Sequence, residues 1–114
     1  MKPHELELLR RHQQGETVVI NKGHCINLMK HLKGQGVLKP IHRPMKLHNP
    51  FCIDRDGTRE EVIQKYRDYL ADHPELMPEI EKCRGKILMC FCHPQPCHGD
   101  VIIQILNETA ALQN

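Results

Sequence analysis

The sequence predicts one α/β domain with a small, mostly parallel sheet flanked by helices. Residues 87–92 form a continuous apolar run without a turn residue, which is typical of a strand buried on both faces. After a turn-rich stretch, residues 101–112 place their apolar side chains on one side at helical spacing, and Asp100 is expected to be the N-cap of this helix. Open α/β sheets repeat this order of strand, loop and helix, and they bind ligands at the carboxyl ends of their strands.

The first part of the chain predicts further helices and strands. Residues 3–14 are expected to form a short helix that begins at a proline and ends before a glycine. The β-branched run at residues 17–21 predicts a strand that neighbours the one at residues 86–92. Further patterns favour a helical turn or two at residues 25–32 and a strand near residues 37–42.

A capping box marks the start of the next helix. Residues 42–56 contain prolines, which cannot donate to a sheet, and are expected to be irregular. Thr58 and Glu61 have the spacing of a capping box, so we expect a helix that runs from there to about Ala71. Its buried stripe is predicted to contain Val62, Tyr66, Tyr69 and Leu70. A second short helix is predicted to begin at Pro74 and to end at Gly85, with Leu76, Met77 and Ile80 facing the core.

The composition fits a single globular domain spanning residues 1–114. Hydrophobic residues make up 39% of the 114 residues and charged residues 26%, as in folded proteins. The formal net charge of +2 is too small to indicate nucleic-acid binding by itself. No run of about 18 apolar residues occurs and the first residues are polar, so we expect no membrane segment and a cytoplasmic location.

The six cysteines are expected to be reduced thiols or metal-bound thiolates. Without a secretory signal, an even number of cysteines is a poor indicator of disulfides. Because cysteine is among the most frequently buried residues, three of them are assigned to the core: Cys25, Cys52 and Cys83. Three of the nine histidines are expected on the solvated surface: His4, His12 and His73.

A zinc site is one interpretation of the stretch between the predicted last strand and last helix. Thiolate and imidazole are preferred zinc ligands. Cys90 and Cys92 would project to the same face of a strand, and Cys97 with His98 (or His93) would complete the ligand set. The C-x-C-x4-C spacing differs, however, from that of common structural zinc sites, whose paired cysteines are two to four residues apart on a turn.

An anion-binding or catalytic turn is a second interpretation. The backbone amides of residues 98–100 would open a helix N-terminus, which favours a phosphate group, and Gly99 permits close approach of a nucleotide or phosphate ligand. The same field would lower the pKa of Cys97. With His98 as base and Asp100 nearby, the turn would then serve a thiol-dependent enzyme acting on a nucleotide or nucleic-acid-derived substrate.

A purely structural role is the third interpretation. Cys90 is then core, Gly99 serves the turn and Asp100 the cap, and the chain is an interaction protein with structural cysteines. Taken singly, the polar residues of the middle segment are also more typical of turns and solvated helices than of sites: Arg43, Asn49, Asp56 and Arg59.

Several segments also resemble a known family in their order along the chain. These are Val18–Asn21, Asn49-Pro50-Phe51, Asp56–Val62 with Tyr66 and Leu70, Cys90-Phe91-Cys92 with Pro94 and Pro96, and Cys97-His98-Gly99-Asp100. The chain is similar over residues 17–108 to the family called domain of unknown function 4326, found in phages and bacteria. It departs from the family pattern at His48, where a glycine is usual, and fits it imperfectly at residues 44–47.

The resemblance implies a shared site and no settled activity. The site would combine the Asn-Pro-Phe loop, the Gly-Thr-Arg helix start and the Cys-His-Gly-Asp turn. We expect Asn49 and Arg59 to face the turn residues Cys92, Cys97, His98 and Asp100, and Arg43, which matches a family arginine, to bind ligand as well. The predicted function is a metal- or nucleotide-binding accessory protein, acting in the host cytoplasm if a phage encodes it. Zinc is the expected cofactor of the first alternative, and a nucleotide or phosphate the expected ligand of the second.

Overall fold

The computed structural model describes residues 1–113 of the chain and the side chains of residues 1–110. The chain folds as α/β, as predicted. Its elements are α1 (Pro3–Gln13), β1 (Val18–Asn21), α2 (Ile26–Leu32), β2 (Leu38–Pro40), α3 (Arg59–Asp72), the 3-10 helix η1 (Pro74–Leu76), α4 (Met77–Glu81), β3 (Ile87–Cys90) and α5 (His98–Gln113). Within this described part, no helix combines the length and the apolar composition needed to cross a membrane.

The sheet has the strand order β1-β3-β2, and both strand pairs are parallel. The predicted neighbourhood of the first and last strands is confirmed, with Asn21 opposite Cys90. On the other side of β3, Pro40 lies opposite Met89. Because all three strands run in the same direction, their carboxyl ends share one edge of the sheet, where the loops after residues 21, 40 and 90 emerge.

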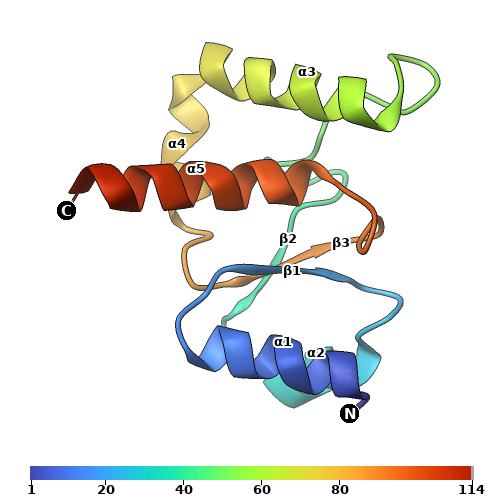
Figure 1. Cartoon of the computed structure of the whole chain (residues 1–114), viewed down its shortest axis with the longest axis vertical. Coiled ribbons are helices and arrows are strands. Elements are labelled where there is room, and N and C mark those ends of the chain that lie inside the picture. The colour runs from blue at the N-terminus through green and yellow to red at the C-terminus, as the bar shows by residue number, and fades with distance from the viewer. Residues whose placement is uncertain (114) are drawn as a thin grey trace.

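Helices cover both faces of the sheet (Figure 1). α1 and α2 lie on one side, and α5 lies on the other with α3 packed along it. β1 and β3 are buried on both faces, whereas β2 is half-buried, so alternate residues of β1 and β3 enter two separate cores. The core beneath α1 and α2 contains Leu8, Val18, Ile20, Cys25, Leu28, Leu32, Ile87 and Met89. The core beneath α5 and α3 includes Val19, Ile41, Leu47, Tyr66, Leu88, Cys90, Cys97, Val101 and Ile102.

Two buried polar side chains join distant segments. The hydroxyl of Tyr66, on α3, donates to the carbonyl of Leu47 at 2.7 Å, which attaches the long β2–α3 connection to the core. The carboxylate of Glu5 accepts from the backbone N–H of Lys2 at 3.0 Å and from that of Leu28 at 2.7 Å, which joins α1 to α2. Both side chains satisfy their hydrogen bonds internally, as buried polar groups must.

The ends of β3 and α5 differ from the prediction. β3 ends at Cys90, not at residue 92, because the side-chain Nδ2 of Asn21 donates to the carbonyls of Phe91 and His93 (3.0 and 2.9 Å) and bends the chain out of the sheet. α5 begins at His98, so Asp100 lies in its first turn and is not the N-cap.

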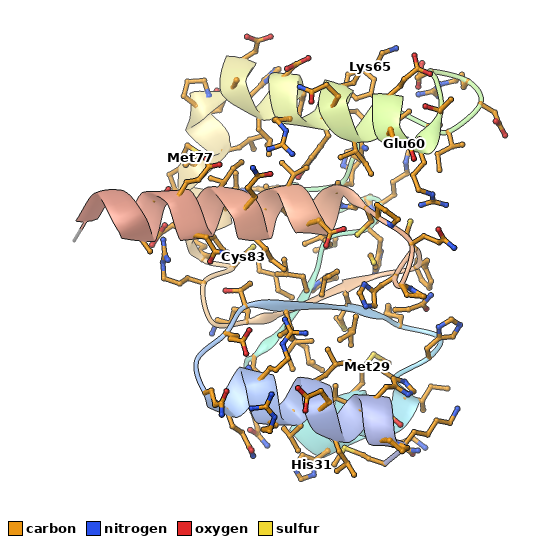
Figure 2. All side chains as sticks on the ribbon, viewed as in Figure 1. Met29, His31, Glu60, Lys65, Met77 and Cys83 are labelled. Carbon is orange, nitrogen blue, oxygen red and sulfur yellow. The ribbon has the colours of Figure 1, made fainter. Side chains whose placement is uncertain are left out.

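Several predicted side-chain positions are also corrected. Cys25 and Cys83 are buried as predicted, but Cys52 is half-buried because its loop lies outside the core. Met77 is 37% exposed, since the single turn of α4 directs only Ile80 into the core (Figure 2). Two of the histidines expected in solvent, His12 and His73, are half-buried.

Candidate functional site

A cleft of about 430 Å³ lies at the carboxyl edge of the sheet. Its walls come from the loop after β2, the loop at residues 49–53, the first turns of α3 and the β3–α5 connection. Most of the predicted site residues line it: Arg43, Asn49, Arg59, Cys90, Cys92, Cys97 and His98. Residues widely separated in sequence therefore meet where an open α/β sheet is expected to bind its ligand.

Two thiols face each other at the base of this cleft. The Sγ atoms of Cys90 and Cys97 are 3.6 Å apart, and both cysteines are free. The Cys97 Sγ also accepts the backbone N–H of Gly99 at 3.3 Å, while the Oδ2 of Asp100 accepts the N–H of Cys97 at 3.0 Å. The sulfur of Cys97 thus occupies the anion position at the N-terminus of α5.

This contact shifts the pKa values of the two thiols in opposite directions. The hydrogen bond from Cys97, helped by the backbone N–H groups of Cys92 and His93, lowers the pKa of Cys90 to about 6. The same hydrogen bond and burial raise the pKa of Cys97, so the expectation that the helix N-terminus lowers it is wrong: the N–H of Gly99 acts in that direction but is outweighed. The pair therefore loses one proton near neutral pH and retains the other, because two adjacent thiolates would repel each other.

His98 is held by the core and not by Asp100. Its Nε2 lies 2.7 Å from the carbonyl oxygen of Ile41, which can only accept, so Nε2 carries the proton and Nδ1 the lone pair. The ring also packs edge-on against Tyr66, with centroids 5.0 Å apart. Burial lowers the pKa of His98, so the imidazole is neutral at pH 7. Asp100 is exposed, and its Oδ2 accepts the backbone N–H of Cys97. The three residues predicted to act together in catalysis, Cys97, His98 and Asp100, therefore form no side-chain to side-chain hydrogen bond with one another within the described residues.

Gly99 lies beneath the cleft and does not line it. A Cβ added here would come 2.9 Å from Cγ2 of Val19 and 3.0 Å from Cδ1 of Ile41. The structure therefore gives this glycine a packing role, which brings the first turn of α5 close to β1 and the end of β2.

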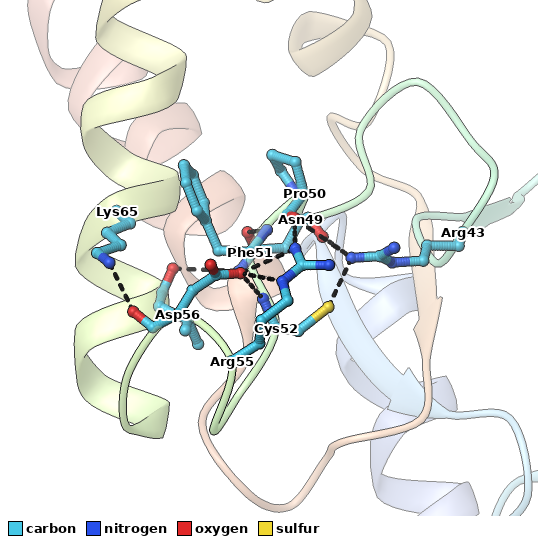
Figure 3. Close-up of polar contacts among 9 residues, drawn as sticks. Arg43, Asn49, Pro50, Phe51, Cys52, Arg55, Asp56 and Lys65 are labelled. Atoms are coloured by element: carbon cyan, nitrogen blue, oxygen red, sulfur yellow. Dashed lines mark hydrogen bonds and ion pairs between the residues drawn. The ribbon is translucent and has the colours of Figure 1, made fainter.

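The loop at residues 49–57 is braced by its own polar groups (Figure 3). The Nδ2 of Asn49 donates to the carbonyl of Val62, and its Oδ1 accepts the N–H of Phe51 at 3.0 Å. The Oδ2 of Asp56 accepts the N–H of Cys52 at 2.8 Å. Asn49 was predicted to contact ligand, but both ends of its side chain are used to fix one wall of the cleft.

Two arginines give the cleft its charge. The Nη2 of Arg43 donates to the carbonyls of Asn49 and Pro50 and to the Sγ of Cys52 at 2.9 Å (Figure 3). The Nη1 of Arg59 donates to the carbonyl of Pro96 at 3.0 Å. Among the described residues neither guanidinium forms an ion pair, and no aspartate or glutamate lines the cleft.

A family model described as "Domain of unknown function (DUF4326)" matches residues 26–108, which contain every residue that lines the cleft. The chain belongs to this family. The family match begins after β1, so β1 lies outside it although the resemblance suggested a start at residue 17.

Two relatives of this DUF4326 protein come from viruses. The chain is 36% identical over 56 residues to the "Uncharacterized 12.4 kDa protein in nrdA-td intergenic region" of Enterobacteria phage T4, covering 46% of this chain and 52% of that protein. It is 32% identical over 68 residues to an uncharacterised protein of Acanthamoeba polyphaga mimivirus, covering 53% of this chain and 52% of the other. The chain thus spans about half the length of these curated relatives. No solved structure matches it.

Sequence reasoning missed the aromatic and cationic residues at the mouth of the cleft. Phe91 is 63% exposed, although it was predicted to belong to a buried strand. Its ring centroid lies 5.2 Å from that of His42 and 5.8 Å from the Nζ of Lys22. The family pattern of an aromatic residue between two cysteines was the signal that could have identified Phe91.

The predicted zinc ligands share the cleft without forming a set of three or more. Within the described residues, no such group of histidine, cysteine, aspartate or glutamate is arranged to hold a metal ion. The closest approach is the pair Cys90 and Cys97, with Cys92 and His98 lining the same cleft.

Proposed function

We propose that the cleft binds a small anionic ligand of the nucleotide or phosphate class. The observation that carries this proposal is the presence of two guanidinium groups, those of Arg43 and Arg59, in a cleft whose described lining contains no carboxylate. A guanidinium that hydrogen-bonds only to neutral groups keeps its positive charge uncompensated, and phosphate is a preferred partner because it accepts paired hydrogen bonds.

The size and lining of the cleft suit such a ligand. A volume of about 430 Å³ falls within the range of small-molecule sites, about 300–1,000 Å³. Apolar side chains from α3 and the preceding loop, including Phe51, Val62 and Ile63, form the remaining wall. A few polar groups on an otherwise apolar surface are the usual composition of a site for an organic ligand.

We place the anionic group between the two arginines and not at the N-terminus of α5. The backbone N–H groups of Cys97 and Gly99 already donate to Asp100 and to the Cys97 sulfur. A phosphate at the helix terminus would have to displace these partners and would also meet the negative charge of the thiol pair. Arg43 and Arg59 also donate to neighbouring groups, but each does so through a single Nη atom, which leaves further N–H groups of each guanidinium without a partner among the described residues.

Calorimetric titration with inorganic phosphate and with nucleoside mono-, di- and triphosphates tests this proposal. Arg59→Gln removes one charge and should weaken binding by about 10-fold or more. Arg10→Gln, on α1 and outside the cleft, removes the same charge and should leave the affinity unchanged. An absence of binding by all these anions, or equal losses in the two variants, would contradict the proposal.

A second candidate function is zinc binding by Cys90 and Cys97. Their Sγ–Sγ distance of 3.6 Å is close to the edge of a tetrahedral zinc–thiolate site, about 3.8 Å for Zn–S bonds of about 2.3 Å. Cys92 and His98 line the same cleft and are the candidates for further ligands. Native mass spectrometry should then detect one zinc ion, which Cys90→Ser removes, and a chelator should lower the Tm. A metal-free protein with an unchanged Tm would eliminate this candidate.

A further inference from the structure

Phe91 lies at the mouth of the anion-binding cleft with its ring unusually open to solvent. It is 63% exposed, more than the other large hydrophobic side chains that are exposed in the described part of the chain. Exposed apolar surface beside a polar rim is typical of binding sites, because a ligand that covers this surface removes it from water, which is favourable. Ile53, which is 40% exposed, lines the same cleft.

The position of Phe91 is fixed by its backbone. The Nδ2 of Asn21 donates to the carbonyl oxygen of Phe91 at 3.0 Å and to that of His93 at 2.9 Å. The N–H of Lys22 donates to the carbonyl of Cys90 at 2.8 Å, which holds the preceding residue. Little conformational freedom of the backbone is therefore lost when a ligand contacts the ring.

The surroundings of Phe91 are cationic. The Nζ of Lys22 lies 5.8 Å from its ring centroid. Arg43 and Arg59 line the cleft into which the ring opens. An exposed aromatic ring next to positive charges is the combination that proteins use to bind a nucleobase and its phosphate together.

We infer that Phe91 is the platform on which a nucleobase stacks while the phosphate of the same ligand lies between Arg43 and Arg59. This inference rests on the proposed function and narrows it: the ligand carries both a base and a phosphate, and inorganic phosphate alone uses only half of the site. The base and phosphate can belong to a free nucleotide or to the end of a single strand.

A single tryptophan provides the measurement. The chain contains no tryptophan, so Phe91→Trp introduces a unique fluorophore at an exposed position where the larger ring can be accommodated. Nucleoside monophosphates should quench its fluorescence, purines more than pyrimidines, whereas inorganic phosphate should bind without quenching. In the wild-type background, Phe91→Ala should weaken nucleotide binding by about 10-fold and leave phosphate binding unchanged.

Matched variants separate stacking from simple burial. Phe91→Leu keeps apolar area but removes the aromatic face, and should behave like the alanine variant towards purine nucleotides. Leu6→Ala removes an exposed apolar side chain on α1 and should have no effect. Titration with a short single-stranded oligonucleotide distinguishes the two sources of the base, because a strand that binds much more tightly than the mononucleotide identifies nucleic acid as the ligand.

Each failure has a distinct meaning. Unchanged nucleotide affinity in Phe91→Ala, with a loss retained in Arg59→Gln, overturns the stacking inference and leaves the anion site intact. Equal losses of phosphate and nucleotide binding in Phe91→Ala overturn it as well, since the ring would then act on the arginines and not on a base. If no anion binds to the wild-type protein, both the proposed function and this inference fall.

Discussion

The sulfur atom of Cys97 lies between the sulfur of Cys90 and the backbone N–H of Gly99, at 3.6 and 3.3 Å from them. Cys90 ends the central strand and Cys97 immediately precedes α5, so the contact links sheet to helix at the base of the cleft. Because the two thiols share a hydrogen bond, their ionisation depends on both partners. This dependence can be measured.

The first prediction concerns the acidity of Cys90. Its pKa of about 6 depends mainly on the hydrogen bond from the Cys97 thiol. Cys97→Ala removes that donor and should move the pKa of Cys90 toward the ordinary thiol range of about 8–9. Thiolate absorbance of chelator-treated protein, followed against pH, gives the midpoint directly and avoids the limited reagent access of a side chain that is 1% exposed.

Cys83 provides the internal comparison for this titration. Burial raises its pKa to about 11, so it should ionise well above the Cys90 step in both proteins. A low-pH step that persists with the same midpoint in Cys97→Ala would show that the thiol pair does not set the acidity of Cys90.

The second prediction concerns the packing of Gly99. Gly99→Ala adds a methyl group 2.9 Å from Val19 and 3.0 Å from Ile41, both of which are buried. The resulting overpacking should lower the free energy of unfolding by about 1–3 kcal/mol, although alanine is the better helix former by about 1 kcal/mol. Urea denaturation measures the difference. Asn107→Ala, at an exposed position of the same helix, is the control and should be neutral or stabilising. A Gly99→Ala variant that is likewise neutral or stabilising would show that α5 does not pack this closely against the sheet.

The third prediction concerns the pH dependence of stability. Burial lowers the pKa of His98 below its usual value of 6.5, so the unfolded state binds a proton at a higher pH than the folded state does. As the pH falls below about 6.5, protonation therefore favours unfolding, and the stability contributed by neutral His98 is lost until the folded-state pKa is reached.

Urea denaturation between about pH 7.5 and about pH 5.5 measures this loss. His98→Gln should be less stable than wild type at the upper pH, because the hydrogen bond to Ile41 is weakened, and should lose less stability on acidification. The two proteins share the other eight histidines, so the difference between the two slopes isolates His98. Parallel slopes would mean that His98 is as easily protonated in the folded state as in the unfolded state.

Local patterns predicted the elements better than their ends. The capping box of α3 forms as expected, with the N–H of Glu61 donating to the hydroxyl of Thr58 at 3.2 Å, because all its partners lie within four residues. The end of β3 was placed two residues late. It is decided by the side chain of Asn21, about 70 residues away in sequence, and no apolar pattern contains that information.

The candidate site, like the ends of the elements, was predicted only in part, because local patterns do not contain long-range contacts. The strand-to-helix turn located Cys97 and His98 from local sequence, and the family resemblance added Arg43 and Arg59. The direction of each side chain could not be predicted: His98 turns into the core toward Ile41, and Phe91 turns out into solvent. The direction of each side chain depends on where the packing of distant segments leaves space in the core.

The last prediction tests how firmly the wall of the cleft is attached to the core. The hydroxyl of Tyr66 donates to the carbonyl of Leu47, in the connection that carries both Arg43 and Asn49. Tyr66→Phe leaves that carbonyl without its buried donor and should lower the free energy of unfolding by about 1–2 kcal/mol. Tyr69→Phe is the matched control on the same helix, because Tyr69 is half-buried and its hydroxyl forms no hydrogen bond within the described residues, so its loss should be nearly neutral. If the connection is positioned through Tyr66, the Tyr66→Phe variant should also show faster amide hydrogen exchange around Leu47 and weaker anion binding. A fall in stability with unchanged exchange around Leu47 would mean that the hydroxyl stabilises the core without positioning the wall of the cleft.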